Sequence, residues 1–198
     1  MANTSGGSLV EGLVALALIG LGLAVALPNF MTLRGKASLE YLASHLMSDA
    51  VRCRAAAINR RSNIGLMFGE ERGAYYYDIV ADGNGNGVSR RDVAKKRDTV
   101  IGPRVWIDRL CRGAKLGVPT GWRVPDPGGS GRLRSGDGLR AGRSAIVSFS
   151  PLGDATPATV YLNDGRERML AMRVYGGTAR VRVLEWRRGW QSWRRLPL

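Results

Sequence analysis

The distribution of apolar residues predicts a long helix at the start of the chain. Residues 12–27 read GLVALALIGLGLAVAL and contain no charge, and the run extends back to residue 7 with Glu11 as its one charged side chain. A helix of about 20 apolar residues is long enough to span a bilayer, so we expect this segment to be membrane-spanning. A carboxylate at membrane depth costs about 2–3 kcal/mol or more, and Glu11 is therefore expected to have a partner.

A single apolar stripe continues the helical pattern beyond Pro28. Seven small or apolar residues recur at steps of three or four: Leu39, Leu42, Ala43, Leu46, Ala50, Cys53 and Ala57. This spacing is typical of a helix that packs one face against a core. The lone His45 lies beside the stripe with no second ligand type near it, and we interpret it as a surface or packing residue.

Short β-rich segments follow the helix and predict an antiparallel sheet. The candidate strands are residues 63–68, 75–80, 100–107, 144–149, 159–162, 168–175 and 178–186. The Gly/Pro/Arg-rich residues 117–142 are predicted to form a long loop, and Gly176 and Gly177 are predicted to turn the last hairpin. The expected fold class is α+β, with a long N-terminal, membrane-spanning helix packed on an antiparallel β-sheet head.

The composition excludes several classes of site. The 198 residues contain 30 Lys and Arg against 16 Asp and Glu, a formal net charge of +14. This charge favours a polyanionic partner, although Arg-rich codon usage explains it equally well. One His and two Cys are too few for a zinc site of Cys and His ligands. We find no nucleophile–base arrangement, carboxylate pair with a clear role or phosphate loop, so we predict no catalytic residues and no enzymatic activity.

The segment from Gly6 to Phe30 carries a recognisable motif, GGSLVE followed by the apolar run and ALPNF. It resembles the processing signal of type IV pilins and pseudopilins, in which a prepilin peptidase cuts after a glycine. Glu11 lies five residues after Gly6, and Pro28 lies seventeen residues after Glu11, as in that family. A secretory signal peptide and a plain membrane anchor are the alternatives, and neither accounts for Glu11.

The resemblance implies roles for four of these residues. Cleavage between Gly6 and Gly7 would leave a free, methylated α-amino group on Gly7. Glu11 of one subunit would pair with that amine on a neighbour, which offsets the desolvation of both charges and fixes the axial register. Pro28 would kink the helix, because it removes one helical hydrogen bond.

Within that family the chain is similar to the minor pseudopilin H / FimT-like (GspH/FimT) branch. The similarity rests on the helix LASHLMSDAVRCRAAAINRRSNIGLMF, the loop DGNGNGVSRRD and the segment GTARVR. It implies a leader at residues 1–6, a transmembrane and filament-core half-helix at residues 7–29, and a periplasmic head at residues 30–198 that includes the second half of the helix.

The function implied by this resemblance is that of a minor subunit near the tip of a filament. The filament would belong to a type II secretion or type IV pilus system, and the subunit would cross the bacterial inner membrane once. The implied partners are other pilins or pseudopilins, the prepilin peptidase, the inner-membrane assembly platform and the inner membrane itself.

A second motif resembles half of a calcium-binding loop. Asp82, Asn84 and Asn86 place oxygen ligands at positions one, three and five, with glycines between them. Position twelve is Val93, so Asp92 would have to close the site. A Ca²⁺ site and an ion-free Asx turn are the two alternatives, and no other cofactor is expected.

The chain contains two cysteines, Cys53 and Cys111. In an oxidising compartment they could form a disulfide from the helix to the start of the loop region. The position of Cys53 on the apolar stripe equally fits a buried thiol, and the sequence gives no distance between the two.

The C-terminal segment, residues 166–198, combines basic and aromatic residues. Trp186, Trp190 and Trp193 recur among arginines, a combination that can contact phosphates and stack on bases. The alternative function is therefore that of a DNA-binding minor pilin for DNA uptake. The candidate nucleic-acid contacts are Arg180, Arg182, Arg187, Arg188, Arg194 and Arg195. A solvated basic face, or docking onto anionic lipid or a partner pilin, would use the same residues.

Overall fold

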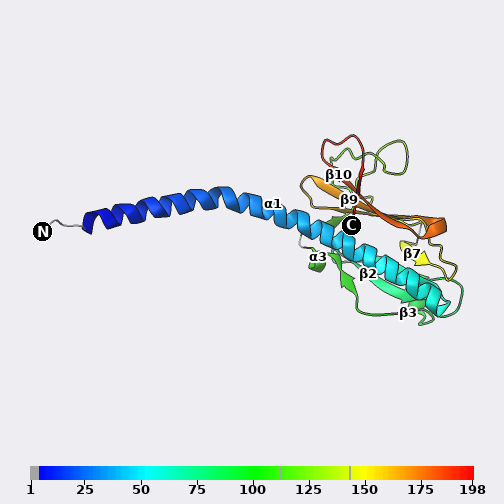
Figure 1. The fold of residues 1–198 in the computed structure, drawn as a ribbon. Helices are drawn as coiled ribbons and strands as arrows, with labels where there is room; N and C mark the ends of the chain where they lie inside the picture. The colour runs from blue at the N-terminus through cyan, green and yellow to red at the C-terminus, as the bar shows by residue number, and fades with distance from the viewer. Residues whose placement is uncertain (1–4, 112, 143) are drawn as a thin grey trace. The chain divides into compact units, whose positions relative to one another are not determined.

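The computed structural model describes residues 5–198 except residues 112 and 143. Side chains are described at residues 9–24 and from residue 39 onward, with the same two exceptions. The chain divides into two compact units, Met1–Ala37 and Ser38–Leu198. Helix α1, Ser5–Arg60, belongs to both units (Figure 1). We refer to the second unit as the head.

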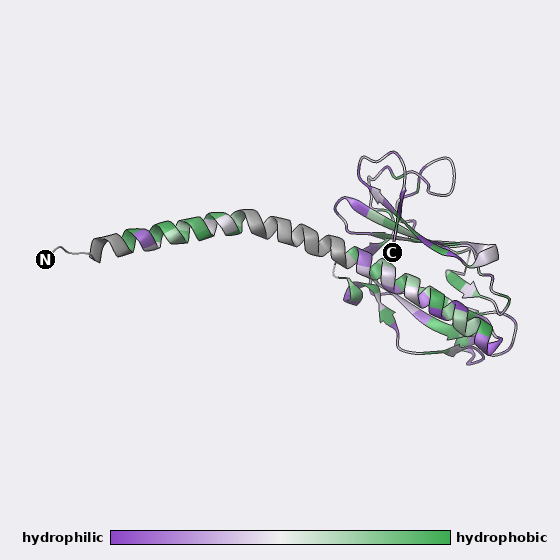
Figure 2. Ribbon diagram, viewed as in Figure 1, coloured by the Kyte–Doolittle hydropathy of each residue, from purple (hydrophilic) through white to green (hydrophobic). Residues whose placement is uncertain are grey.

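In the first unit, α1 exposes large apolar side chains along residues 9–24. Leu9 is 71% exposed, Leu16 68% and Leu21 70%, and Figure 2 shows this stretch of the helix as mainly hydrophobic. No helix among the described residues is long and apolar enough to cross a membrane. The prediction of a membrane-spanning helix is corrected by this finding, since crossing a bilayer core takes about 20 consecutive apolar residues in one helix.

The described residues of the head contain the second half of α1, two more short helices, a 3₁₀ turn and eleven strands. The helical elements after α1 are α2 (Arg90–Ala94), α3 (Ile107–Leu110) and η1 (Gly176–Thr178). The strands are β1 (Ile64–Glu71), β2 (Ala74–Ala81), β3 (Thr99–Val100), β4 (Val105–Trp106), β5 (Lys115–Leu116), β6 (Leu139–Arg140), β7 (Ile146–Phe149), β8 (Ala158–Asn163), β9 (Arg168–Val174), β10 (Val181–Arg187) and β11 (Arg194–Leu196).

The strands form two antiparallel sheets. Sheet A has the order β3-β2-β1-β7, with β4 also paired to β2, and sheet B has the order β11-β10-β9-β8-β5, with β6 also paired to β8. In sheet A, Glu71 pairs with Ala74, so Arg72 and Gly73 alone make the turn. Both have positive φ, 52° and 80°, which is the backbone of the type I′ hairpin turn. The antiparallel α+β class is thus confirmed, although the strands form two sheets where one was expected.

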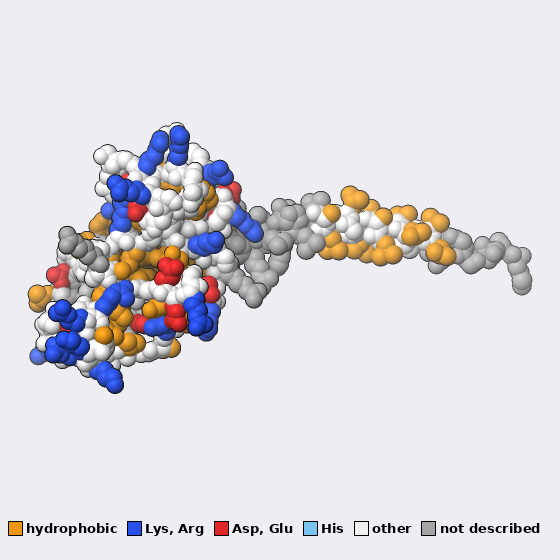
Figure 3. Space-filling view, turned by 180° about the vertical axis from the view of Figure 1, so that it is seen from behind, with side chains coloured by type: hydrophobic (Ala, Val, Ile, Leu, Met, Phe, Trp, Pro, Cys, Tyr) orange, Lys and Arg blue, Asp and Glu red, His pale blue; other side chains and the backbone are white. Residues whose placement is uncertain are grey.

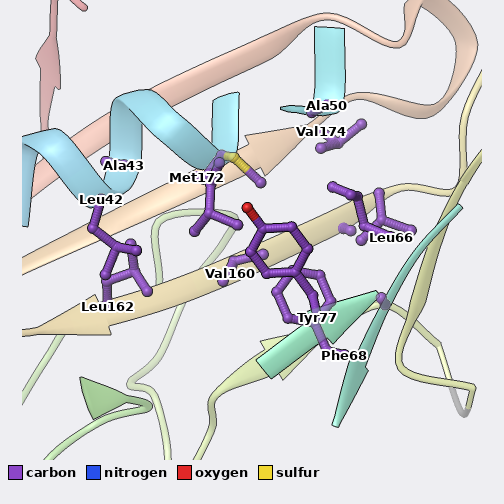
Figure 4. Close-up of a cluster of buried hydrophobic side chains, with 14 of the residues drawn as sticks. Leu42, Ala43, Ala50, Leu66, Phe68, Tyr77, Val160, Leu162, Met172 and Val174 are labelled. Atoms are coloured by element: carbon purple, nitrogen blue, oxygen red, sulfur yellow. The ribbon is translucent and has the colours of Figure 1, made fainter. Parts of the chain in front are cut away.

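The core of the head lies where the second half of α1 meets both sheets. Leu42 and Leu46 of the helix belong to one buried cluster with Leu66 of sheet A and Leu162 and Met172 of sheet B. Figure 4 shows these layers, with side chains from the helix and from both sheets directed toward one another. All seven residues of the predicted apolar stripe are buried in this cluster, so the prediction of a packed helix face is confirmed.

The outer face of each sheet is covered by a loop rather than by a helix layer. Val88, in the loop after β2, and Val93, in α2, pack on the outer face of sheet A. Val118, Val124 and Leu133, in the long loop between β5 and β6, are buried on the outer face of sheet B. The predicted long loop at residues 117–142 is therefore packed along part of its length, and of its described residues only Leu139–Arg140, strand β6, form a strand.

The last hairpin differs from its prediction. A 3₁₀ turn, Gly176–Thr178, precedes Ala179, which has φ 47°, and β10 begins at residue 181 where residue 178 was expected. The hairpin is therefore closed by a longer connection than Gly176 and Gly177 alone. Because β10 begins at residue 181, Arg180 lies outside the strand, and Arg182 and Arg187 are the arginines within it.

Candidate functional site

The residues implicated in processing and assembly all lie on α1. Glu11 is exposed, and no ion pair joins it to any described side chain. At Gly12 and Gly20 an added Cβ would meet no atom within 4 Å, so no described residue of the first unit packs on the helix at these positions. Gly6, Gly7 and Pro28 fall inside the bounds of α1, but their surroundings lie outside the described residues. The cleavage site and the kink therefore stay predictions.

A polar cluster lies under the second half of α1. The Tyr77 hydroxyl donates to Asp49, which is buried, and Asp49 also accepts from Arg52. His45 Nδ1 lies 3.1 Å from the Tyr77 hydroxyl. Burial, and then the hydrogen bond to Asp49, raise the pKa of Tyr77. His45 is thus a packing residue that contacts this cluster, as the sequence indicated.

A buried arginine ties the helix to sheet B. Arg168 of β9 donates to Glu40 of α1 and to Glu185 of β10, the latter over 2.7 Å. Arg187 donates to the same Glu185 oxygen over 2.7 Å. Burial would raise the pKa of Glu185, but hydrogen bonds from Arg187 and Arg168 outweigh it and lower that pKa below its ordinary value. The cluster pins the start of the buried half of α1 to the sheet.

The predicted calcium loop is held together by its own hydrogen bonds. Asp82 accepts from the backbone N–H groups of Asn84 (3.1 Å), Gly85 (2.8 Å) and Gly87 (2.8 Å) and from the side chain of Asn63. Burial would raise the pKa of Asp82, but these hydrogen bonds outweigh it and lower the pKa. The carboxylate of Asp82 therefore acts as the centre of an Asx-type loop.

The other residues predicted to bind Ca²⁺ also hold the loop together through hydrogen bonds. Asn86 Nδ2 donates to the carboxylate of Asp92 over 3.2 Å. Ser89 caps the start of α2, because its side-chain oxygen accepts from the backbone N–H of Asp92 and its hydroxyl donates to the Asp92 carboxylate. Asp98, which closes the loop, accepts from the N–H groups of Gly83 and Ser89. Within the described part of the chain, no group of three His, Cys, Asp or Glu side chains is placed to hold a metal ion. A Ca²⁺ site at Asp82, Asn84, Asn86 and Asp92 stays a prediction.

Cys53 and Cys111 lie in the same buried cluster, between α1 and the sheets. The structure holds both residues as thiols. Burial, and then the charge of Asp49, raise the pKa of Cys53 to about 12. A disulfide between the two stays a prediction.

The tryptophans of the C-terminal segment are used for packing. Trp186 is buried and its Nε1 donates to the carbonyl of Trp190 over 2.8 Å. Trp193 Nε1 donates to the carbonyl of Pro125 over 2.7 Å, which ties the segment to the long loop. With Val118 and Val124 these indoles form a second core on the outer face of sheet B. They are therefore not laid out as a row of exposed stacking platforms.

The six candidate nucleic-acid contacts do not gather on one face of sheet B. Arg182 lies on the outer face, whereas Arg187, an odd number of residues further, lies on the inner face with Glu185. In β11, Arg194 pairs with Glu185 and Arg195 pairs with Leu184 of the outer face. Arg180 and Arg188 are exposed outside the strands. Figure 3 shows basic side chains spread over one face of the head with acidic ones among them. DNA binding by these arginines stays a prediction.

A hollow on the outer face of sheet B was not found from the sequence. It is lined by Arg140 of β6, Thr159 and Tyr161 of β8, Arg173 of β9 and Asp126 of the long loop. These residues come from four separate segments, and only strand register brings them together. Strand alternation alone could have placed Thr159 and Tyr161 on one face, but not Arg140 or Arg173 beside them.

Comparisons with protein-family models, with curated proteins and with solved structures give no match. The function of the chain must therefore be inferred from its own residues. Two features stand out: a helix that exposes apolar side chains around one carboxylate, and a compact head with a polar hollow.

Proposed function

We propose that the chain is a subunit of a pilus or pseudopilus filament, a minor member of the type IV pilin class. One observation carries the proposal: within their own unit, residues 9–24 of α1 expose an apolar surface around Glu11 that no described residue of that unit covers. Such a surface is unstable in water and favours burial against other chains. Helices of neighbouring subunits would supply that cover in the core of a filament.

The energetics of burial support association through this helix. Full burial of one leucine side chain stabilises by about 1.5–3 kcal/mol relative to exposure. Leu9, Leu16, Leu18 and Leu21 are each more than two-thirds exposed, so their burial would offset much of the cost of ordering two chains. Residues 9–24 take no part in the core of the head, to which α1 contributes from Leu39 onward. Assembly can therefore proceed without rearrangement of the head.

Glu11 would fix the axial position of each subunit against its neighbour. A carboxylate buried among leucines without a partner strongly destabilises an assembly, whereas a paired one is tolerated. No described side chain of the same molecule supplies that partner. The α-amino group that cleavage between Gly6 and Gly7 would create on a neighbouring copy fits the requirement in charge. Subunits would then stack in the one arrangement that pairs every Glu11.

The first test is processing. The full chain is expressed with and without a prepilin peptidase, and its intact mass is measured. We expect the loss of residues 1–6, with one methyl group added to Gly7. A Gly6→Val variant should keep its full mass, whereas Gly22→Val, a matched change at an uncovered helix glycine, should still be cut. An unchanged mass of the native chain in the presence of an active peptidase would contradict the proposal.

The second test is assembly. Glu11→Gln should leave the thermal unfolding of the head unchanged and remove the chain from the sheared filament fraction of cells that carry the machinery. Glu70→Gln, at an exposed glutamate of the head, is the matched control and should assemble normally. Normal incorporation of Glu11→Gln would show that register does not depend on this carboxylate.

A further inference from the structure

A row of polar side chains crosses the outer face of sheet B. Arg140 of β6 pairs with Thr159 of β8, Thr159 pairs with Arg173 of β9, and Arg173 pairs with Arg182 of β10. Directly paired residues of antiparallel strands lie on the same face within reach of one another. Two adjoining hollows share Arg140, Thr159 and Arg173. Arg140, Thr159 and Arg173 therefore line one continuous depression, and Arg182 extends the row beside it.

The guanidinium groups of the row are held in place by the protein. Arg140 is joined to Asp126 and Asp137 by ion pairs, the second over 2.8 Å. Arg173 Nη1 donates to the carbonyl of Pro127 over 2.6 Å. The ring of Tyr175 has Arg173 at 5.5 Å and Arg182 at 5.4 Å from its centroid. Side chains fixed in this way lose little freedom when they bind a ligand.

Several donors in the row are unused. The hydroxyl groups of Thr159 and Tyr161 make no hydrogen bond with any described residue. No ion pair joins Arg173 or Arg182 to a described carboxylate, although the charge of Arg173 acts on nearby Asp126. The Nε atom of Arg182 is buried and has no hydrogen-bond partner in the described chain. Buried donors without acceptors are rare in folded proteins. Their grouping around one depression points to a ligand that supplies acceptor oxygens.

The net charge of the row favours a carboxylate over a phosphate dianion. Arg140, Arg173 and Arg182 contribute three positive charges, and Asp126 and Asp137 contribute two negative ones. The resulting net charge of +1 matches one carboxylate. A phosphate dianion would bring a second negative charge close to Asp126 and Asp137. Planar guanidinium groups also fit the two oxygens of a carboxylate in bidentate geometry.

The shape of the depression indicates where that carboxylate comes from. Both hollows open to solvent, and the second is bordered by Pro157 and Tyr175. An open, partly apolar depression that crosses strands suits an extended polypeptide better than an enclosed small molecule. We propose that this row binds an acidic side chain of a partner protein, with Arg173, Arg182 and Thr159 as its donors.

The experiment titrates the full chain, kept in mild detergent because residues 9–24 are apolar and exposed, with short peptides. The probes are acetyl-Glu-Glu-amide, the neutral acetyl-Gln-Gln-amide and inorganic phosphate. Nε–Hε signals of the ¹⁵N-labelled arginines report binding. We expect saturable shifts at Arg173 and Arg182 with the Glu peptide, none with the Gln peptide, and weaker binding of phosphate.

Variants distinguish binding at this site from nonspecific attraction to a basic surface. Arg173→Gln should weaken binding of the Glu peptide at least tenfold, and Thr159→Val, which removes the hydroxyl but keeps the shape, about threefold. Arg132→Gln, at an exposed arginine of the same loop region, should bind as the native chain does. Thermal unfolding of each variant establishes that the head is intact. Unsaturable shifts, equal binding by Arg173→Gln, or tighter binding of phosphate than of the Glu peptide would overturn the proposal.

Discussion

Both halves of α1 carry leucines, and the halves differ in what covers these side chains. Leu16 in the first half is 68% exposed, whereas Leu46 in the second half is fully buried between the two sheets. The first half is apolar on all sides, and the second is apolar along one stripe with charges beside it. The difference teaches that an apolar stripe finds its partner within the chain, whereas an all-round apolar surface has to find it in other molecules.

The largest expected effect is on the buried half. Leu46→Ala removes a side chain that is completely enclosed, and a leucine truncation of this kind destabilises by about 4 kcal/mol because the cavity does not fully collapse. Leu16→Ala, the same change in the exposed half, should alter the free energy of unfolding of the head by less than about 0.5 kcal/mol. Urea unfolding followed by tryptophan fluorescence measures both. Equal effects would remove the distinction between the halves.

A slightly smaller effect is expected at the contact that pins the buried half. Arg168→Met leaves the buried Glu185 without its main partner and breaks the link to Glu40, so we expect a loss of about 3 kcal/mol. Arg187→Met, which changes a half-exposed partner of the same glutamate, should cost less than about 1 kcal/mol. Chemical unfolding of the two variants compares them. A tolerated Arg168→Met would show that packing alone holds the helix on sheet B.

Acid should weaken the head. The pKa values of Asp82 and Glu185 lie below their ordinary values of 3.8 and 4.5 because the folded state hydrogen-bonds their charged forms. Their contribution is thus complete above about pH 5 and is lost as the pH falls through the ordinary values toward the lowered ones. Unfolding measured from pH 7 to pH 3 should show this fall. Asp82→Asn should flatten it, and an unchanged slope would exclude Asp82 as a source.

The smallest effect concerns reactivity rather than stability. A pKa of about 12 for Cys53 leaves little thiolate at pH 8, so a Cys111→Ala variant should react with a disulfide reagent about 10³ times more slowly when folded than in urea. The native chain purified without reductant provides the complementary measurement. Two reactive thiols in urea are expected if no bridge forms, and none if Cys53 and Cys111 are joined.

Local pattern predicted the helix and the strands well, and failed where the answer depended on register. The stripe from Leu39 to Ala57 was readable because the 3.6-residue period of a helix marks its buried face. The division into two sheets was not readable, because β7 pairs with β1 across about eighty intervening residues. No local signal specifies such a pairing.

The candidate sites also divide into residues that the sequence reveals and residues that only the fold reveals. Glu11 is conspicuous in the sequence because it interrupts an apolar run. Arg168 and Glu185, by contrast, look like ordinary surface charges until the fold buries them. The tryptophans of the C-terminal segment suggested an exposed basic and aromatic face, but in the fold their rings pack on the outer face of sheet B. Burial of this kind depends on a loop some seventy residues earlier, which composition cannot reveal.

The hydrogen bond between Trp193 and Pro125 joins residues 68 positions apart, and this has a consequence during synthesis. At about 5–20 residues per second, a ribosome needs roughly 3–14 s to add the intervening residues. Throughout that time Val118 and Val124 have been made, but the indole ring of Trp193 has not. The nascent head therefore passes through a stage with an open apolar surface, at which a chaperone would find its natural point of contact.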